Sequence, residues 1–192
     1  RGVEIAMENV LKALTTWQPW ASMLACGAKH YETRGWPTKY RGPVAIHAAM
    51  KPLRQNKALS DSKLREIVQS EIDAGCCPVW DDMPLGKIIA VADLVNVWHI
   101  VYNVGMRGKV VQRIPVVAES LTVDKHDPHF DDFFAPTEKE KALGDWTPGR
   151  YAWEFANIRL LPEPIPARGQ QGLWTYAGNI PLLGVEGRSP LC

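Results

Sequence analysis

The sequence predicts an α+β fold, a small mixed β-barrel flanked by two or three helices. Strand-like segments alternate irregularly with a few helical ones, and no regular strand–helix–strand repeat runs through the chain. Such a repeat would instead predict a parallel α/β sheet. The chain of 192 residues is long enough for one domain with one substantial core. We therefore expect a single domain at residues 7–192, after a vector or upstream remnant at residues 1–6.

The first half of the chain predicts three strands and two helices. The strands are expected at residues 8–17, 30–36 and 43–49. Pro19 opens the first helix and Gly27 ends it, because proline suits the first turn of a helix and glycine its end. From Pro52 to about Ala74, apolar residues recur at roughly helical spacing, which predicts a longer helix.

The second half is dominated by residues 86–100, a long run rich in valine and isoleucine that predicts a strand. Aromatic residues at alternate positions predict another strand at 150–161. A short helix is expected near 136–143. The stretch that follows residue 161 reads as a loop before the chain becomes apolar again at Leu173 and Trp174.

The charge is nearly balanced, with 22 basic and 21 acidic residues and a net charge of +1. A protein that holds a long polynucleotide usually carries a basic surplus, because it neutralises many phosphates. A broad phosphate-binding surface is therefore not expected, although a local basic patch stays open. The sequence has no apolar run long enough to span a membrane and no signal-peptide pattern, so we expect a cytoplasmic location and no membrane partner.

The residue spacing predicts no metal site and no cofactor. The four cysteines do not form a zinc-type pair, and reduced thiols are expected at Cys26, Cys76, Cys77 and Cys192. His126 and His129 flank a proline in an expected loop, and two such ligands are weak support for a metal.

The main chemical signal is a charged cluster just after the first helix. Lys29 lies at the helix–strand junction, and Glu32, Arg34 and Trp36 follow at alternate positions of a strand. Period-two alternation places those three side chains on one face. On spacing alone, an alternative is a solvated surface whose ion pairs contribute about 0–1 kcal/mol.

Gly27, Lys29, Glu32 and Arg34 fit the pattern G-x-K-x-x-E-x-R within LTTWQPWASMLACGAKHYETRGWPTKYRGPVAIHAA. That run, with GKIIAVADLVNV and GDWTPGRYAWEFANIRLLPEPIPARGQQGLW further on, resembles the ASCH family, a branch of the PUA-like β-barrels. The resemblance spans roughly residues 11 to 176. It implies a small closed barrel with a cleft beside the helix of the motif, and work on RNA, DNA or a modified nucleoside.

Some small bacterial members of that family hydrolyse N(4)-acetylcytidine to cytidine without a metal, using the motif lysine, a threonine and a distant glutamate. By position, the lysine corresponds to Lys29. Glu32 stands where those enzymes have the threonine, which is a departure from their pattern, and Thr33 is the neighbouring residue on the opposite strand face. The distant glutamate has no clear counterpart in this chain; Glu119 is one candidate.

Hydrolysis of an acylated cytosine needs an attacker, a stabiliser for the oxyanion and a proton for the leaving nitrogen. We predict that Glu32 activates water and that Lys29 stabilises the oxyanion and passes a proton. Thr33 is a further catalytic candidate, and Arg34 is expected to hold Glu32 or the substrate.

A nucleobase also needs a flat apolar slot, because stacking on an aromatic ring contributes about 1–3 kcal/mol per base. Trp17, Trp36 and Pro19 are the expected contacts, whereas Trp20 is expected to be core. The Lys-Glu-Lys run at 139–141 is expected to be a solvated helix face.

Two functions remain in competition at this point. The first is a metal-independent amidohydrolase that removes the acyl group from N(4)-acylated cytosine or cytidine. The second is an RNA- or DNA-binding PUA-like module, with or without ribonuclease activity. The near-neutral charge favours a small modified nucleoside or nucleobase as partner, whereas the glutamate at the threonine position counts against the enzyme.

Overall fold

The structure, a computed structural model, describes residues 10–103, 108–112 and 133–181. Residues 1–6, Glu119, His126 and His129 lie outside these ranges, so the expectations for them stay predictions. No helix within the described ranges is long and apolar enough to cross a membrane.

The described residues form one sheet with a continuous path of six strands in the order β2-β7-β4-β3-β1-β8. Strands β5 and β6 extend it from the far end of β4. The strands are β1 (Val10–Thr16), β2 (Tyr31–Arg34), β3 (Gly42–Ala48), β4 (Lys87–Asn103), β5 (Gly108–Gln112), β6 (Phe133–Phe134), β7 (Tyr151–Pro166) and β8 (Leu173–Ala177). Strands β1 and β3 pair in parallel, and the other pairs are antiparallel.

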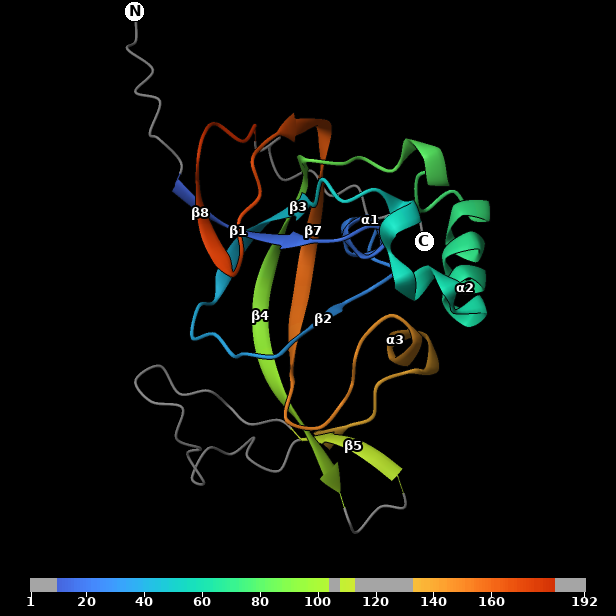
Figure 1. The fold of residues 1–192 in the computed structure, drawn as a ribbon. Helices are drawn as coiled ribbons and strands as arrows, with labels where there is room; N and C mark the ends of the chain where they lie inside the picture. Colours follow the sequence, from blue (N-terminus) through green and yellow to red (C-terminus); the bar gives the residue numbers. More distant parts are fainter. Residues whose placement is uncertain (1–9, 104–107, 113–132, 182–192) are drawn as a thin grey trace, which may run out of the picture.

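The long pair β4 and β7 gives the sheet its curl (Figure 1). Their register shifts three times, between Ile88 and Ala90, Val91 and Asp93, and Leu94 and Asn96. Irregularities of this kind bend a strand and increase its twist. The result is a curled half-barrel, which confirms the α+β class and the small PUA-like barrel. The closed barrel that the resemblance implies is not reached, because the end strands β2 and β8 do not pair with each other in the described part of the chain.

Three helices occur in the described ranges, all on one side of the sheet: α1 (Trp20–Ala25), α2 (Ser62–Asp73) and α3 (Glu138–Ala142) (Figure 1). Helix α1 lies between the sheet and α2. Its Leu24 belongs to the main core with strand residues, whereas its Met23 packs in a second cluster with Leu64 and Val68 of α2. A six-residue helix buried on both faces therefore carries the segment that leads into the motif.

The predicted helix from Pro52 to Ala74 is wrong over residues 52–61. Two 3-10 turns, Leu53–Gln55 and Lys57–Ser60, come first, and α2 begins only at Ser62. The Asn56 side chain donates to the carbonyl oxygen of Gln18 and also accepts from the amide of Ala58, which holds the chain in a turn. Asp61 then caps α2 by accepting from the amides of Lys63 and Leu64.

The loop expected directly after residue 161 is also wrong, because β7 continues to Pro166. This part of β7 still pairs with β4, with Ile165 opposite Ile88. The short strand β2 pairs only with residues 151–154 of β7. The later prolines therefore lie where no described strand runs along one edge of β7, and there a missing amide donor costs nothing.

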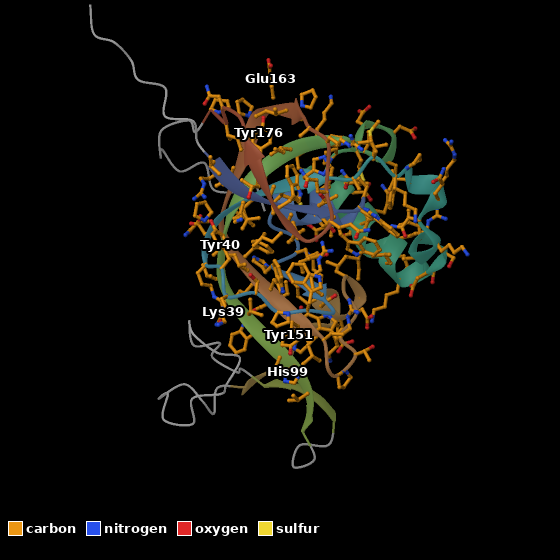
Figure 2. All side chains as sticks on the ribbon, turned by 60° about the vertical axis from the view of Figure 1, so that its left-hand side comes forward. Lys39, Tyr40, His99, Tyr151, Glu163 and Tyr176 are labelled. Atoms are coloured by element: carbon orange, nitrogen blue, oxygen red, sulfur yellow. The ribbon has the colours of Figure 1, made fainter. Side chains whose placement is uncertain are left out.

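Strand β8 lies against β1 and ends the six-strand path, at the position where the sequence turns apolar again. Its Trp174 is buried, and the indole Nε1 donates to Thr15 Oγ1 at 3.0 Å. At the opposite end of the sheet, His99 of β4 stacks on Tyr151 of β7 with ring centroids 5.0 Å apart (Figure 2). The β5–β6 extension beyond this pair was not predicted.

We expect Trp174→Ala to lower the free energy of unfolding by about 3–5 kcal/mol, because it leaves a large cavity under β1 and β8. Trp174→Phe should cost less, since it keeps most of the ring and removes only the bond to Thr15. Urea denaturation measures both. The exposed Val10→Ala is the control; a Trp174→Ala loss as small as the control's would show that β8 does not stabilise the sheet.

Candidate functional site

The turn between α1 and β2 brings the motif residues together. Gly27 ends the helix with a φ of 81°, a left-handed conformation that glycine adopts without strain. The amide of Lys29 then donates to the carbonyl oxygen of Met23, so the chain folds back along the helix before β2 begins. Glu32 and Arg34 follow on β2, opposite Trp153 and Tyr151 of β7.

Lys29 is fully buried, and its ammonium group connects three parts of the fold. It donates to the carbonyl oxygens of Tyr31 and Leu143, the latter at 2.9 Å, and its Nζ lies 3.7 Å from Oε2 of Glu32. Burial lowers the pKa of Lys29, because it disfavours the charged form, and the carboxylates of Glu32 and Glu140 oppose this effect. The three N–H groups of the ammonium thus have three acceptors around them.

Glu32 and Arg34 connect β2 to β1, which are not neighbours in the sheet. Oε1 of Glu32 accepts from Thr16 Oγ1 at 3.2 Å and lies 3.2 Å from Nη2 of Arg34. The same Arg34 nitrogen donates to the carbonyl oxygen of Thr15 at 2.9 Å. Lys29, Glu32 and Arg34 therefore meet in one mostly buried network, so the solvated surface that spacing alone left open is wrong.

A cavity of about 470 Å³ lies beside this network. Its walls come from β2, the start of α1, the turn before α2 with the start of that helix, and the segment after α3. The lining residues are Trp20, Glu32, Thr33, Ala58, Ser60, Asp61, Leu64, Ala142, Leu143, Gly144, Asp145 and Arg150.

The aromatic wall of the cavity is not the one expected. Trp20, predicted to be core, is only partly buried and lines the cavity, although its other side packs on the α1–α2 cluster. Trp17, Trp36 and Pro19 are not among the lining residues. Helix α1 has six residues and lies between the sheet and α2. Trp20 is its first residue and therefore lies at the edge of this packed region.

Trp17 and Trp36 instead lie partly exposed, at 46% and 36%. The ammonium of Lys51 lies 3.4 Å from the centre of the Trp17 ring, a cation–π contact. Trp36 packs edge-on against Trp153 with ring centroids 4.6 Å apart. Pro19 is buried at the start of α1 and follows a cis peptide bond.

Thr33 lines the cavity and is held from the segment after α3. Its Oγ1 accepts from the amide of Asp145 at 2.9 Å, so its hydroxyl hydrogen is left to donate. Gly144 allows this approach, because a Cβ there would lie 3.1 Å from Cγ2 of Thr33. The neighbouring Arg150 pairs with the Asp145 carboxylate at 3.2 Å.

The structure adds one buried acid that the sequence reading missed. Glu140 was expected on a solvated face, yet it is 5% exposed, and its Oε1 accepts from the amide of His30 at 2.7 Å. That expectation is wrong because the inner face of the short α3 lies against the start of β2. The sequence signal for this burial is a helix start of the T-x-x-E type, which is typical of a capping box. Thr137 accepts from the amide of Glu140, as in a capping box. The side chain of Glu140, however, accepts from the amide of His30 instead of that of Thr137.

Glu140 also shapes the electrostatics of this region. It raises the pKa of His30, whose Nδ1 lies 3.6 Å from its Oε1. Its second oxygen, Oε2, is buried and has no hydrogen-bond partner among the described residues. Within the same ranges, no group of three or more histidine, cysteine, aspartate or glutamate side chains is arranged to hold a metal ion.

The comparison with known families shows to which family the chain belongs. The family model of the ASCH domain matches residues 14–159, more than half of the chain, including the whole Lys29–Glu32–Arg34 motif. The chain belongs to the ASCH family. No curated protein matches it. An ASCH domain of this PUA-like shape indicates a module that binds RNA or hydrolyses a substrate related to nucleic acids.

In this ASCH domain, we expect Lys29→Met to lower the free energy of unfolding by about 3–5 kcal/mol at neutral pH. It removes one partner of a buried charge pair and leaves two carbonyl oxygens without a donor. Because the folded pKa of Lys29 lies below its unfolded value of about 10.4, the folded state binds fewer protons in that interval. The stability of the wild type relative to Lys29→Met should therefore rise as the pH rises toward that value.

Urea unfolding at several pH values measures this difference, and effects common to both proteins, such as tyrosine ionisation, cancel. The exposed Lys57→Met is the matched control and should show neither the loss nor the pH dependence. A difference that shrinks or stays flat as the pH rises would contradict the prediction.

Proposed function

We propose that this ASCH domain hydrolyses the acyl group of an N(4)-acylated cytosine or cytidine without a metal, with the base in the cavity beside β2. The observation that carries the proposal is the position of Glu32. Glu32 is one of the residues that line the cavity, and Thr16, Arg34 and Lys29 hold its carboxylate in place. The volume of about 470 Å³ lies within the range of pockets that bind small molecules.

The first chemical step is the activation of water. Glu32 takes a proton from a water molecule, and the resulting hydroxide attacks the acyl carbon. Breakage of the C–N bond then releases cytosine N4, which takes the proton from Glu32, and a carboxylic acid leaves as the second product. Glu32 thus serves as base and then as acid, which balances the proton without a second titrating group.

The oxyanion needs a donor that faces the cavity. Thr33 lines the cavity and has a hydroxyl hydrogen left to donate, so we assign it this role. Lys29 was expected to hold the oxyanion, but it does not line the cavity and its ammonium already faces three acceptors. Its role in the proposed reaction is to position Glu32. Arg34 has the same role from the other side.

The base requires a wall that packs against its ring. Trp20 offers an indole at the cavity, and Ala58 and Leu64 offer apolar surface. Among the described residues, three acidic residues and one arginine line the cavity, and the guanidinium of that arginine is paired with Asp145. This balance supports an uncharged base or nucleoside over a phosphate-rich polymer.

A binding module is the second candidate, favoured by Trp17 and Trp36. Both rings are partly exposed, and Lys51 lies over the Trp17 ring. Exposed aromatic rings beside a cation are the elements with which proteins stack and hold single-stranded nucleic acid.

The enzyme proposal predicts turnover of N(4)-acetylcytidine to cytidine, which is measured from the change in ultraviolet absorbance. Glu32→Gln should lower kcat by about 10²–10⁴-fold, because it removes the base. Thr33→Val should lower it by about 10²–10³-fold, whereas Thr33→Ser keeps the hydroxyl and most activity. The exposed Glu66→Gln is the control. No turnover by the wild type would overturn the enzyme, and full activity of Glu32→Gln would overturn the role of Glu32.

The two candidates also differ in their response to salt. Turnover of an uncharged nucleoside should keep its KM as salt rises, because no phosphate is neutralised. A binding module should instead retain a short single-stranded RNA with an affinity that falls linearly on a log–log plot against salt. Trp17→Ala should weaken such retention and leave turnover unchanged. Salt-sensitive retention without turnover would select the module.

A further inference from the structure

Two buried cysteines face each other across the contact between α1 and the segment after α2. Cys26 is the C-cap of α1, and Cys77 follows the turn that ends α2. Both are free, at 4% and 7% exposure. Their Sγ atoms are 2.9 Å apart. A disulfide bond length of about 2.0 Å requires an approach of only about 0.9 Å more.

The surroundings hold both sulfur atoms in place. Sγ of Cys77 also lies 3.5 Å from Sδ of Met23, and Sγ of Cys26 lies 3.5 Å from the carbonyl oxygen of Met23. All three side chains belong to the cluster that packs α1 against α2. The two cysteines are therefore part of the apolar cluster between α1 and α2. Gly75 and Pro78 on either side of Cys77 are exposed, so this segment lies at the surface.

The two thiols differ in acidity. A hydrogen bond from Cys77 lowers the pKa of Cys26, and the same interaction together with burial raises the pKa of Cys77. Cys26 is thus the thiol that more readily forms the nucleophilic thiolate, and Cys77 keeps its proton. Cys26 is thus suited to the first attack on an oxidant, and Cys77 gives up its proton only when it forms the disulfide.

The neighbouring Cys76 differs from Cys26 and Cys77 in its oxidation state. It is disulfide-bonded in the structure, so the expectation of reduced thiols is wrong at this position. The pair formed by Cys26 and Cys77 does not involve that bond.

We propose that Cys26 and Cys77 are a reactive dithiol that a hydroperoxide converts to a disulfide. The thiolate of Cys26 attacks the peroxide, takes one oxygen to become a sulfenic acid and, with a proton, releases an alcohol or water. The thiol of Cys77 then attacks the sulfenic sulfur, the S–S bond forms, and water leaves with the thiol proton. The peroxide is the two-electron oxidant, and the two sulfurs are oxidised.

The disulfide would join the end of the motif helix to the segment after α2. Trp20 of α1 and Leu64 of α2 are two walls of the cavity, so the bond would hold the helices that frame it. This consequence follows from the contacts alone and is independent of which ligand the cavity takes.

The test uses the full chain with Cys76→Ser and Cys192→Ser, so that only Cys26 and Cys77 remain. Hydrogen peroxide under native conditions should remove both thiols, yield a crosslink between the two cysteine peptides in mass spectrometry, and raise the Tm by about 5–10 °C. Dithiothreitol should reverse all three. Thiols that survive peroxide in the folded protein, or oxidation to sulfinic acid without a crosslink, would overturn the proposal.

A second measurement tests the division of roles. Cys77→Ala removes the hydrogen-bond donor and should slow alkylation of Cys26 by iodoacetamide at neutral pH several-fold relative to the parent. Cys77→Ser keeps a donor and should preserve the rate more closely. Equal rates in all three proteins would show that Cys77 does not activate Cys26. Circular dichroism and Tm identify a variant that fails to fold, and for such a variant the crosslink assay on the parent decides.

Discussion

The fold depends on a buried set of charges that joins strands that the sheet does not pair. Among the described strands, backbone pairing attaches β2 only to β7, whereas Arg34 and Glu32 bind Thr15 and Thr16 of β1. Burying such charges is costly, and the cost is offset only when every charged group finds hydrogen bonds. Here each of the three charged residues contacts a second member of the network and at least one further group, and only Nε of Arg34 is buried without a hydrogen-bond partner among their described atoms. The half-barrel is thus joined across its open side by side chains.

These contacts limit the chemical role that each motif residue has. An ammonium that already faces two carbonyl oxygens and a carboxylate has no free donor for a ligand, and a guanidinium bound to a strand carbonyl has little freedom to move. Of the three, only Glu32 reaches the cavity. The cations hold its position, which favours catalysis because a fixed group loses no freedom in the transition state.

The sequence was sufficient for most of the strands and for the motif, and insufficient where tertiary contacts decide. Period-two alternation predicted that Glu32 and Arg34 share a face, and the structure brings them together with Lys29. Helix propensity did not predict that Glu140 is buried, because its burial results from packing of α3 on the start of β2. Nor did it show that β7 would continue through its prolines, since that depends on the length of β2. Trp20 was assigned to the core from its helix face, which describes only one side of its ring.

The location of Trp20 ties the cavity to the rest of the packing. Helix α1 is six residues long, is buried against the sheet on one side and against α2 on the other, and begins at the cavity wall. A short helix held on both faces has no room to shift alone, because interiors are close-packed. Movement of the cavity wall therefore requires movement of α2 or of the segment after α3. Because Leu143 of that segment binds Lys29, a movement of the segment after α3 also reaches the charged network that fixes Glu32.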